Sequence, residues 1–185
     1  NGDQQSLSKV QGMYTYAHPI VDGALLDRLP SLKVISNFGV GVDHIDLKAA
    51  AARGVPVGNT PGAVDGATAD LTMALLLAAA RNVVAGDKHA RSPQFTHYDP
   101  GYFLGLEVFG STLGIVGMGR IGQQVAKRAK AFDMRVIYHN RRRNLQAEAA
   151  LGAEYATLEH LLAESHFVTL NVPLTPETTR FIGEP

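Results

Sequence analysis

The chain has 185 residues, of which 45% are hydrophobic and 18% charged, a composition that fits one or two globular domains. Seventeen Lys and Arg residues balance seventeen Asp and Glu residues, so no overall charge argues for nucleic acid or a membrane as a partner. Cysteine is absent, which excludes disulfides, thiolate nucleophiles and Cys-based zinc sites and favours a cytoplasmic location. The first nine residues lack a signal-peptide pattern, and the longest apolar run, 71–80, is about half a membrane span.

Both ends of the sequence look interrupted. The chain opens with Asn1 rather than Met and closes on residues 183–185, directly after an extended segment. We therefore expect it to be part of a longer protein.

In the first half of the chain, short apolar strands alternate with helices. Apolar periodicity and the Gly and Pro residues between segments predict strands at 13–16, 33–37 and 55–57 and helices at 21–29 and 45–53. This alternation is typical of a parallel α/β unit.

Residues 67–84 have a different composition. They contain neither Gly nor Pro and almost no charge, which predicts one helix of about 18 residues, buried on most of its surface. We place this helix between two domains, with the boundary near Ala85, because residues 86–110 have the irregular spacing of a loop. The expected domains are therefore 1–85 and 86–185.

The second half alternates more regularly. Strands are predicted at 112–116, 135–139 and 167–172, with a short one near Glu154, and helices at 121–132, 145–151 and 158–163. Strands alternating with helices of this length imply right-handed crossovers, and so an α/β fold with a Rossmann-like, doubly wound parallel sheet. The sheet is expected to be incomplete, with the strand at 167–172 at its bare edge.

A glycine-rich turn follows the strand at 112–116. Residues 117–122 read Gly-Met-Gly-Arg-Ile-Gly, a GxGxxG directly after an apolar strand and directly before an amphipathic helix, as in dinucleotide sites. Gly117 allows the tight turn, Gly119 lets a pyrophosphate approach the backbone, and Gly122 lets the helix pack on the strand. The helix N-terminus would offer free N–H groups to the phosphates. The alternative is a glycine-rich turn that binds nothing.

The end of the next strand decides which dinucleotide is preferred. An acidic residue there, about 20 positions after the glycine turn, would bind the ribose 2′-hydroxyl of NAD. This sequence has Asn140, followed by Arg141, Arg142 and Arg143. A neutral residue does not repel a 2′-phosphate, and each arginine contact contributes about 1.5–3 kcal/mol, or roughly tenfold or more in affinity. The pattern predicts NADP, with NAD as the alternative cofactor; a solvated basic turn without function is the other interpretation.

Five stretches resemble the D-isomer-specific 2-hydroxyacid dehydrogenases, over nearly the whole chain: Leu29–Ile35, Asn37–Asp46, Ala69–Arg81, Leu113–Gly122 and Asn171–Thr178. The basic turn and the Asn-Phe-Gly-Val-Gly wording at 37–41 are similar to the glyoxylate/hydroxypyruvate reductase branch. The resemblance implies a flavodoxin-like substrate domain, also incomplete, and a homodimer. It further implies hydride transfer to a small 2-ketoacid, which gives the D-2-hydroxyacid.

The same resemblance implies roles for individual residues. The backbone N–H groups of Val40 and Gly41 would hold the substrate carboxylate as an anion nest. The positions expected at the cofactor or its pocket are Thr72 on the interdomain helix, Gly119, Arg120 and Ile121 at the pyrophosphate, Asn140, Arg141 and Arg142 at the ribose, and Pro173. Alternatively, Val40 and Gly41 form an ordinary strand-ending turn, and Thr72 and Pro173 are packing positions.

In that family an arginine, a glutamate and a histidine polarise the carbonyl and transfer the proton, and all three follow the segment at 173–175. No residue of this chain matches them, so we assign no catalytic residue and expect no useful turnover from this chain alone. None of the seven histidines lies in a matching motif. His166 stands where the family often has Asp, and we interpret it as structural.

Two other functions fit the same fold. A nucleotide-sensing scaffold, as in the C-terminal binding protein corepressors, would favour an acid where Asn140 stands. The NAD-dependent phosphoglycerate and formate dehydrogenase branches would prefer NADH. Titration with NADPH and NADH therefore separates these hypotheses.

Overall fold

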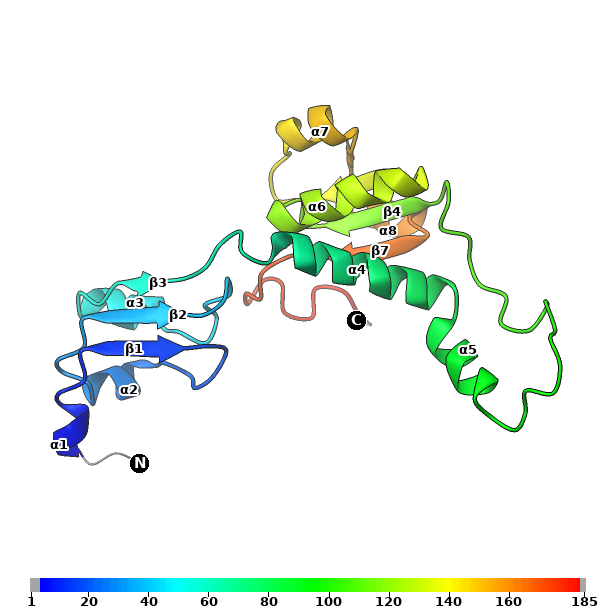
Figure 1. Cartoon of the computed structure of the whole chain (residues 1–185). Coiled ribbons are helices and arrows are strands. Elements are labelled where there is room, and N and C mark those ends of the chain that lie inside the picture. Colours follow the sequence, from blue (N-terminus) through cyan, green and yellow to red (C-terminus); the bar gives the residue numbers. More distant parts are fainter. Residues whose placement is uncertain (1–3, 184–185) are drawn as a thin grey trace. The chain divides into compact units, whose positions relative to one another are not determined.

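The computed structural model describes residues 4–183, and the chain divides into two compact units (Figure 1). The first unit combines Asn1–Ala63 with Pro173–Pro185, and the second is Val64–Val172. Each unit has a parallel sheet and a hydrophobic core of its own. The expected α/β class is confirmed.

The first unit is built on a three-stranded parallel sheet in the order β1-β2-β3, at Gly12–Thr15, Val34–Asn37 and Val57–Gly58. Its helices are α1 (Gln4–Leu7), α2 (Gly23–Asp27) and α3 (Leu47–Ala52). Helices α2 and α3 begin later than the apolar periodicity predicts, because Asp22 and Asp46 cap them. Their carboxylates accept the N–H groups of Leu25 and Ala49 at 2.8 and 2.9 Å. The buried core residues are Val21, Leu26, Leu29, Leu32, Ile35, Ile45, Ala50 and Val55.

The second unit contains a four-stranded parallel sheet in the order β6-β5-β4-β7, at Glu154–Tyr155, Arg135–His139, Thr112–Val116 and Phe167–Leu170. The helices that alternate with these strands are α6 (Arg120–Ala129), continued by a 3-10 turn at Lys130–Phe132, α7 (Leu145–Leu151) and α8 (Leu158–Glu164). Strands β4 and β5 and helix α7 begin and end at the predicted residues. The predicted strand at 167–172 is β7, which ends at Leu170 and lies at the edge of this sheet.

Strand β4 is the buried centre of the second unit. All of its residues are buried, and Leu113 and Ile115 have no exposed surface. Strands β5 and β6 extend the sheet on one side of β4, whereas β7 pairs with its other side. The strand order therefore reverses between β4 and β7, and ligands of doubly wound sheets bind at the carboxyl ends of strands at such a switch point.

The prediction of a single helix at 67–84 is wrong. Instead, α4 covers Asp65–Ala80 and α5 covers Val83–Ala90, with Asn82 between them in a left-handed conformation (φ 53°). The loop at 104–106 binds the end of α4, since the Leu106 N–H donates to the Ala80 carbonyl (2.9 Å). Asn82 Nδ2 also donates to the Leu104 carbonyl (3.2 Å). These two tertiary hydrogen bonds stabilise the break between α4 and α5.

The expected burial of this helix is also wrong. Only Ala69, Met73 and Ala80 of α4 are buried, whereas Leu71 and Leu75 are 60% and 62% exposed. Among residues 4–183 no single helix is long and apolar enough to cross a membrane; only α4 and α5 together, bent by 61°, have the length and composition.

Helix α4 belongs to the second unit, and it lies alongside α6 (Figure 1). Arg128 of α6 forms a salt bridge with Asp70 (Nε to Oδ1, 2.6 Å) and donates from Nη2 to the Gly66 carbonyl (3.3 Å). The division in the structure therefore falls before α4, whereas the expected boundary near Ala85 lies inside α5.

Candidate dinucleotide site

The glycine-rich turn leaves the carboxyl end of β4 in a conformation that requires glycine. Gly117 has φ 101°, and a Cβ on it would lie 2.6 Å from the Asn171 carbonyl oxygen. A Cβ on Gly122 would collide with the Gly117 carbonyl and lie 3.2 Å from Ile115 Cγ2. The two glycines thus allow the turn to pack against both the β7 end and its own helix.

The N-terminus of α6 is open. Gly119 is the N-cap residue, so no side chain caps the helix, and Gly119 and Arg120 are exposed. A Cβ on Gly119 would have no neighbour within 4 Å. Half-buried Ile121 follows in the first turn. An uncapped helix start, with its N–H groups and partial positive charge, is suited to bind a phosphate.

The turn lies at the switch point of the sheet. The Gly117 N–H donates to the His139 carbonyl at the end of β5 (2.9 Å), and the Asn171 N–H, just after β7, donates to the Val116 carbonyl (2.7 Å). These two hydrogen bonds hold the carboxyl ends of β5, β4 and β7 together around Gly117. This is where a doubly wound sheet binds a nucleotide.

Asn140 contacts the glycine-rich turn directly. Its Oδ1 accepts the N–H of Met118 at 2.8 Å. The sequence predicts this residue at the ribose. In the structure its side chain contacts the backbone of Met118, the residue that follows Gly117. The amide NH2 group of Asn140 has no hydrogen bond among residues 4–183 and is available to a ligand.

The three arginines after Asn140 are exposed but not equivalent. Arg143 pairs with Glu148 (Nη2 to Oε2, 2.6 Å), and its guanidinium lies over the Tyr155 ring, 5.5 Å from the centroid. Within the described part of the chain, Arg141 and Arg142 form no salt bridge. The hydrogen bond from Arg143 lowers the pKa of Glu148, and that from Tyr138 adds to the effect. Two of the three cations are therefore free for an anionic ligand.

The contacts of Thr72 and Pro173 in the structure do not indicate a role in cofactor binding. Thr72 is half-buried on α4, and its hydroxyl donates to the Thr68 carbonyl (2.8 Å). Pro173 is exposed, and its carbonyl accepts the hydroxyl of Thr178 (2.7 Å). Both roles stay predictions.

In the first unit, the turn after β2 holds the predicted carboxylate site. Asn37, which is 2% exposed, donates from Nδ2 to the carbonyls of Gly39 (3.0 Å) and Gly41 (2.9 Å). Asn59 Nδ2 donates to the Val40 carbonyl (2.9 Å). With these carbonyls bonded, the N–H groups of Val40 and Gly41 have no hydrogen bond among the described residues. Such a pair of N–H groups is suited to bind an anion.

Sequence reasoning missed the two asparagines that shape this turn. Asn37 ends β2 and directly precedes the glycine-rich turn, which is a usable signal for a turn-forming side chain. Asn59 bonds a residue 19 positions away, which no local pattern indicates.

His166 has the structural role that the sequence predicts. Its Nδ1 accepts the N–H of Thr112 at 3.1 Å, and so fixes the start of β4. His44 is buried, and its Nε2 has no hydrogen-bond partner among the described residues.

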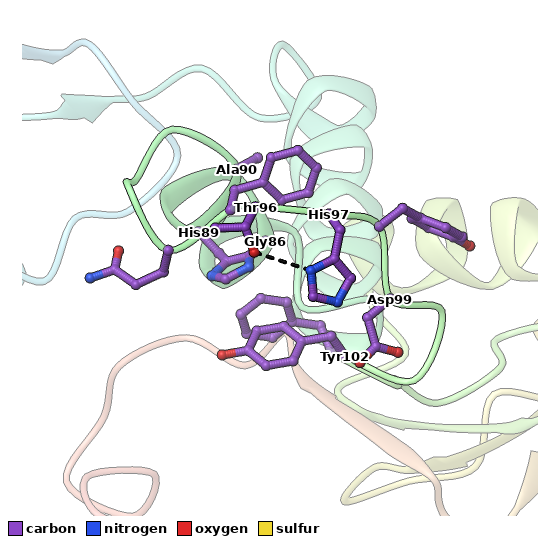
Figure 2. Close-up of a pocket in the computed structure, with 11 residues that line it drawn as sticks. Gly86, His89, Ala90, Thr96, His97, Asp99 and Tyr102 are labelled. Atoms are coloured by element: carbon purple, nitrogen blue, oxygen red, sulfur yellow. Dashed lines mark hydrogen bonds between the residues drawn. The ribbon is translucent and has the colours of Figure 1, made fainter.

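A cavity of about 320 Å³ lies elsewhere in the second unit, and Figure 2 shows the side chains that line it. It is formed by α5 and the segment at 94–103. The His89 ring packs against Tyr102, Phe103 and Phe95, with centroid separations of 4.6, 5.4 and 5.9 Å. None of the predicted cofactor residues lines this cavity, which is therefore separate from the glycine-rich turn.

A reversing parallel sheet with a GxGxxG turn and an open helix N-terminus defines a dinucleotide-binding protein of the doubly wound class. Residues 73–185 match the family model described as "D-isomer specific 2-hydroxyacid dehydrogenase, NAD binding domain". The chain therefore belongs to the D-isomer specific 2-hydroxyacid dehydrogenases, and the resemblance found in the sequence is confirmed.

Relatives of known name extend over both units. The chain is 47% identical over 184 residues to the glyoxylate reductase of Pyrococcus furiosus, covering 97% of this chain and 55% of that protein. The crystal structure of a glyoxylate reductase from Paecilomyes thermophila matches with a TM-score of 0.85 at 36% identity, covering 97% and 56%. The D-lactate dehydrogenase of Aquifex aeolicus, in complex with NAD and lactic acid, matches with a TM-score of 0.88 at 29% identity, covering 96% and 52%. The chain thus spans about half the length of these relatives.

Proposed function

We propose that the protein reduces a small 2-ketoacid, of the glyoxylate or hydroxypyruvate type, with hydride from NADPH. The first unit is then part of the substrate domain, and the second unit is part of the dinucleotide domain. The observation that carries the cofactor part of this proposal is that Arg141 and Arg142 form no salt bridge within residues 4–183. They directly follow Asn140, whose side chain bonds the glycine-rich turn. The names of the relatives support the ketoacid class.

The cofactor preference is tested by fluorescence titration of the chain with NADPH and with NADH. We expect NADPH to bind at least about tenfold more tightly, because one charge-assisted contact contributes about 1.5–3 kcal/mol. Competition by 2′,5′-ADP but not by 5′-AMP would locate the preference at the 2′-phosphate. Equal or tighter binding of NADH would instead support the NAD-dependent branches.

For the substrate, we propose that the N–H groups of Val40 and Gly41 hold the ketoacid carboxylate. The carbonyls of Gly41 and Val40 accept hydrogen bonds from Asn37 and Asn59, whereas the two N–H groups have no partner among the described residues. The carboxylate of Asp43 is close, since a Cβ on Gly41 would lie 3.0 Å from its Oδ1. This charge repels a doubly charged acid more strongly than a monocarboxylate, so we propose a monocarboxylate substrate.

The proposal gives these residues binding roles, and bound NADPH supplies the hydride. Gly117, Gly119, Arg120, Ile121 and Gly122 would hold the pyrophosphate, Asn140, Arg141 and Arg142 the 2′-phosphoribose, and Thr72 and Pro173 the surrounding pocket. The catalytic Arg, Glu and His implied by the family resemblance match no residue here, so the chain alone is proposed to bind cofactor without turnover. A cytoplasmic location is part of the same proposal. A scaffold function without hydride transfer has no contact among residues 4–183 that favours it.

A homodimer is also proposed, through helix α4 and the segments that follow it. The apolar side chains there that are more than half exposed are Leu71, Leu75, Val83, Val84, Leu104, Leu106 and Phe109. Leu71 and Leu75 are four positions apart and so share one face of α4, which gives a partner an apolar strip to cover. Replacing Leu71 and Leu75 together by Glu is expected to convert the dimer to monomer in sedimentation equilibrium. Leu145→Glu, on 67% exposed Leu145 of α7, is the control that should leave the dimer intact. A monomeric parent chain at every concentration would contradict the proposal.

A further inference from the structure

Three hydrogen bonds of Asn144 fix it at the start of α7 and connect it to the glycine-rich turn. Its Oδ1 accepts the N–H of Ala147 at 3.0 Å and so caps α7. Its backbone N–H donates to the hydroxyl of buried Tyr138 at 2.7 Å. Its Nδ2 donates to the carbonyl of Met118, 26 positions away, at 3.2 Å. The first two bonds fix the residue, and the third reaches the glycine-rich turn.

The basic turn, residues 140–144, is thereby hydrogen-bonded to the glycine-rich turn at both of its ends. Asn140 accepts the N–H of Met118, and Asn144 donates to the carbonyl of the same residue. Arg141 and Arg142 lie between these two attachment points. The separation between the arginines and the N-terminus of α6 therefore depends on Met118 being held from both sides.

Glu148 binds Arg143, the third arginine of the basic turn, and so holds it away from the candidate ligand site. It accepts two hydrogen bonds from Arg143, at 3.1 and 2.6 Å, and one from Tyr138, at 2.7 Å. Burial raises the pKa of Tyr138, and its bond to Glu148 raises it further, so the hydroxyl stays a donor. Arg143 is part of the framework around Asn144, and Arg141 and Arg142 are left for the ligand.

We propose that Asn144 is a positioning residue for cofactor discrimination: by bonding Met118, it sets the distance between the pyrophosphate site and the arginines that bind the 2′-phosphate. This inference rests on the proposed preference for NADPH. Both cofactors carry the pyrophosphate, whereas NADPH alone carries the 2′-phosphate. Loosening the link between the two turns therefore weakens NADPH binding selectively.

The test is Asn144→Ser, measured by titration with NADPH and NADH. Serine caps a helix about as well as asparagine, so α7 keeps its cap and the melting temperature should stay within about 3 °C of the parent chain. The shorter side chain cannot reach the Met118 carbonyl. The lost hydrogen bond is internal to the protein, so its free energy, about fivefold in an equilibrium constant, is the upper limit of its effect on binding. The Kd for NADPH should rise several-fold, up to about fivefold, while that for NADH changes less than about twofold.

Thr157→Ser is the matched control. It also exchanges one capping residue for another, at α8, where the Thr157 hydroxyl accepts the His160 N–H at 3.2 Å, and it should change neither Kd. Should Asn144→Ser not fold, Asn144→Thr removes the same bond and also caps the helix.

The outcomes separate this inference from the function on which it rests. A parent chain that prefers NADPH, with a serine variant that keeps the same ratio of the two Kd values, overturns the role of Asn144 alone. A parent chain without preference for NADPH overturns the proposed cofactor, and with it the discrimination that Asn144 would serve. Selective loss of NADPH binding at unchanged melting temperature supports the inference.

Discussion

Replacing Arg141 and Arg142 together by alanine is expected to abolish the preference for NADPH. Both side chains are exposed and without a salt bridge among residues 4–183, so their removal breaks no ion pair of the fold. Two contacts to the 2′-phosphate at about 1.5–3 kcal/mol each predict a rise of roughly 100-fold or more in the Kd for NADPH. The Kd for NADH should change little. Titration of both cofactors at low and high salt measures the effect, which added salt should reduce.

The control for net charge is the double variant Lys127→Ala with Lys130→Ala. Both lysines are exposed in the same unit, at the end of α6 and just after it, and the change in charge is the same. It should leave the selectivity unaltered. An arginine double variant that still prefers NADPH would show that other groups read the 2′-phosphate.

Gly122→Ala is expected to abolish binding of both cofactors and to destabilise the second unit. The new methyl group would collide with the Gly117 carbonyl and approach Ile115 of β4, so the helix and the turn must move apart. Overpacking of this kind costs about 1–3 kcal/mol in the free energy of unfolding. Chemical denaturation and titration with either cofactor measure the two effects.

Gly119→Ala provides the contrast, because φ is −80° there and a Cβ would meet no protein atom within 4 Å. Its stability should match that of the parent chain. Binding of both cofactors should still fall by at least about tenfold, since the methyl group occupies the space through which a phosphate approaches the backbone. Unchanged binding in this variant would argue against the turn as the pyrophosphate site.

Local sequence was sufficient where an element is bounded by its own residues. Strands β4 and β5 are short apolar runs, and α7 lies between Asn144, which caps it, and Gly152, whose φ of 64° ends it. The break between α4 and α5 could not be predicted in this way. It depends on backbone groups of the loop at 104–106, more than 20 positions farther along the chain.

The same limit applies to the candidate site. The glycine-rich turn and the basic turn can be recognised in the sequence because each is a local motif that follows a predicted strand. Their connection through Met118 cannot be recognised, because the bonds from Asn140 and Asn144 span 22 and 26 positions. The local sequence gives no physical reason to separate Arg143 from Arg141 and Arg142, and only the family resemblance assigns the first two to the ribose. Glu148 distinguishes them by holding Arg143.

The reversal of strand order in the second unit also bears on the order in which its strands are expected to fold. The bond between Met118 and Asn140, which accompanies the pairing of β4 with β5, closes a segment of 22 positions. The bond between Thr112 and His166, where β7 joins β4, closes one of 54. Closing the longer segment costs more chain entropy, so we expect β7 to dock after the other strands have paired. Because Gly117 packs on the residue that follows β7, the proposed nucleotide crevice would be complete only at that step, and a bound dinucleotide would then stabilise only chains that have finished folding.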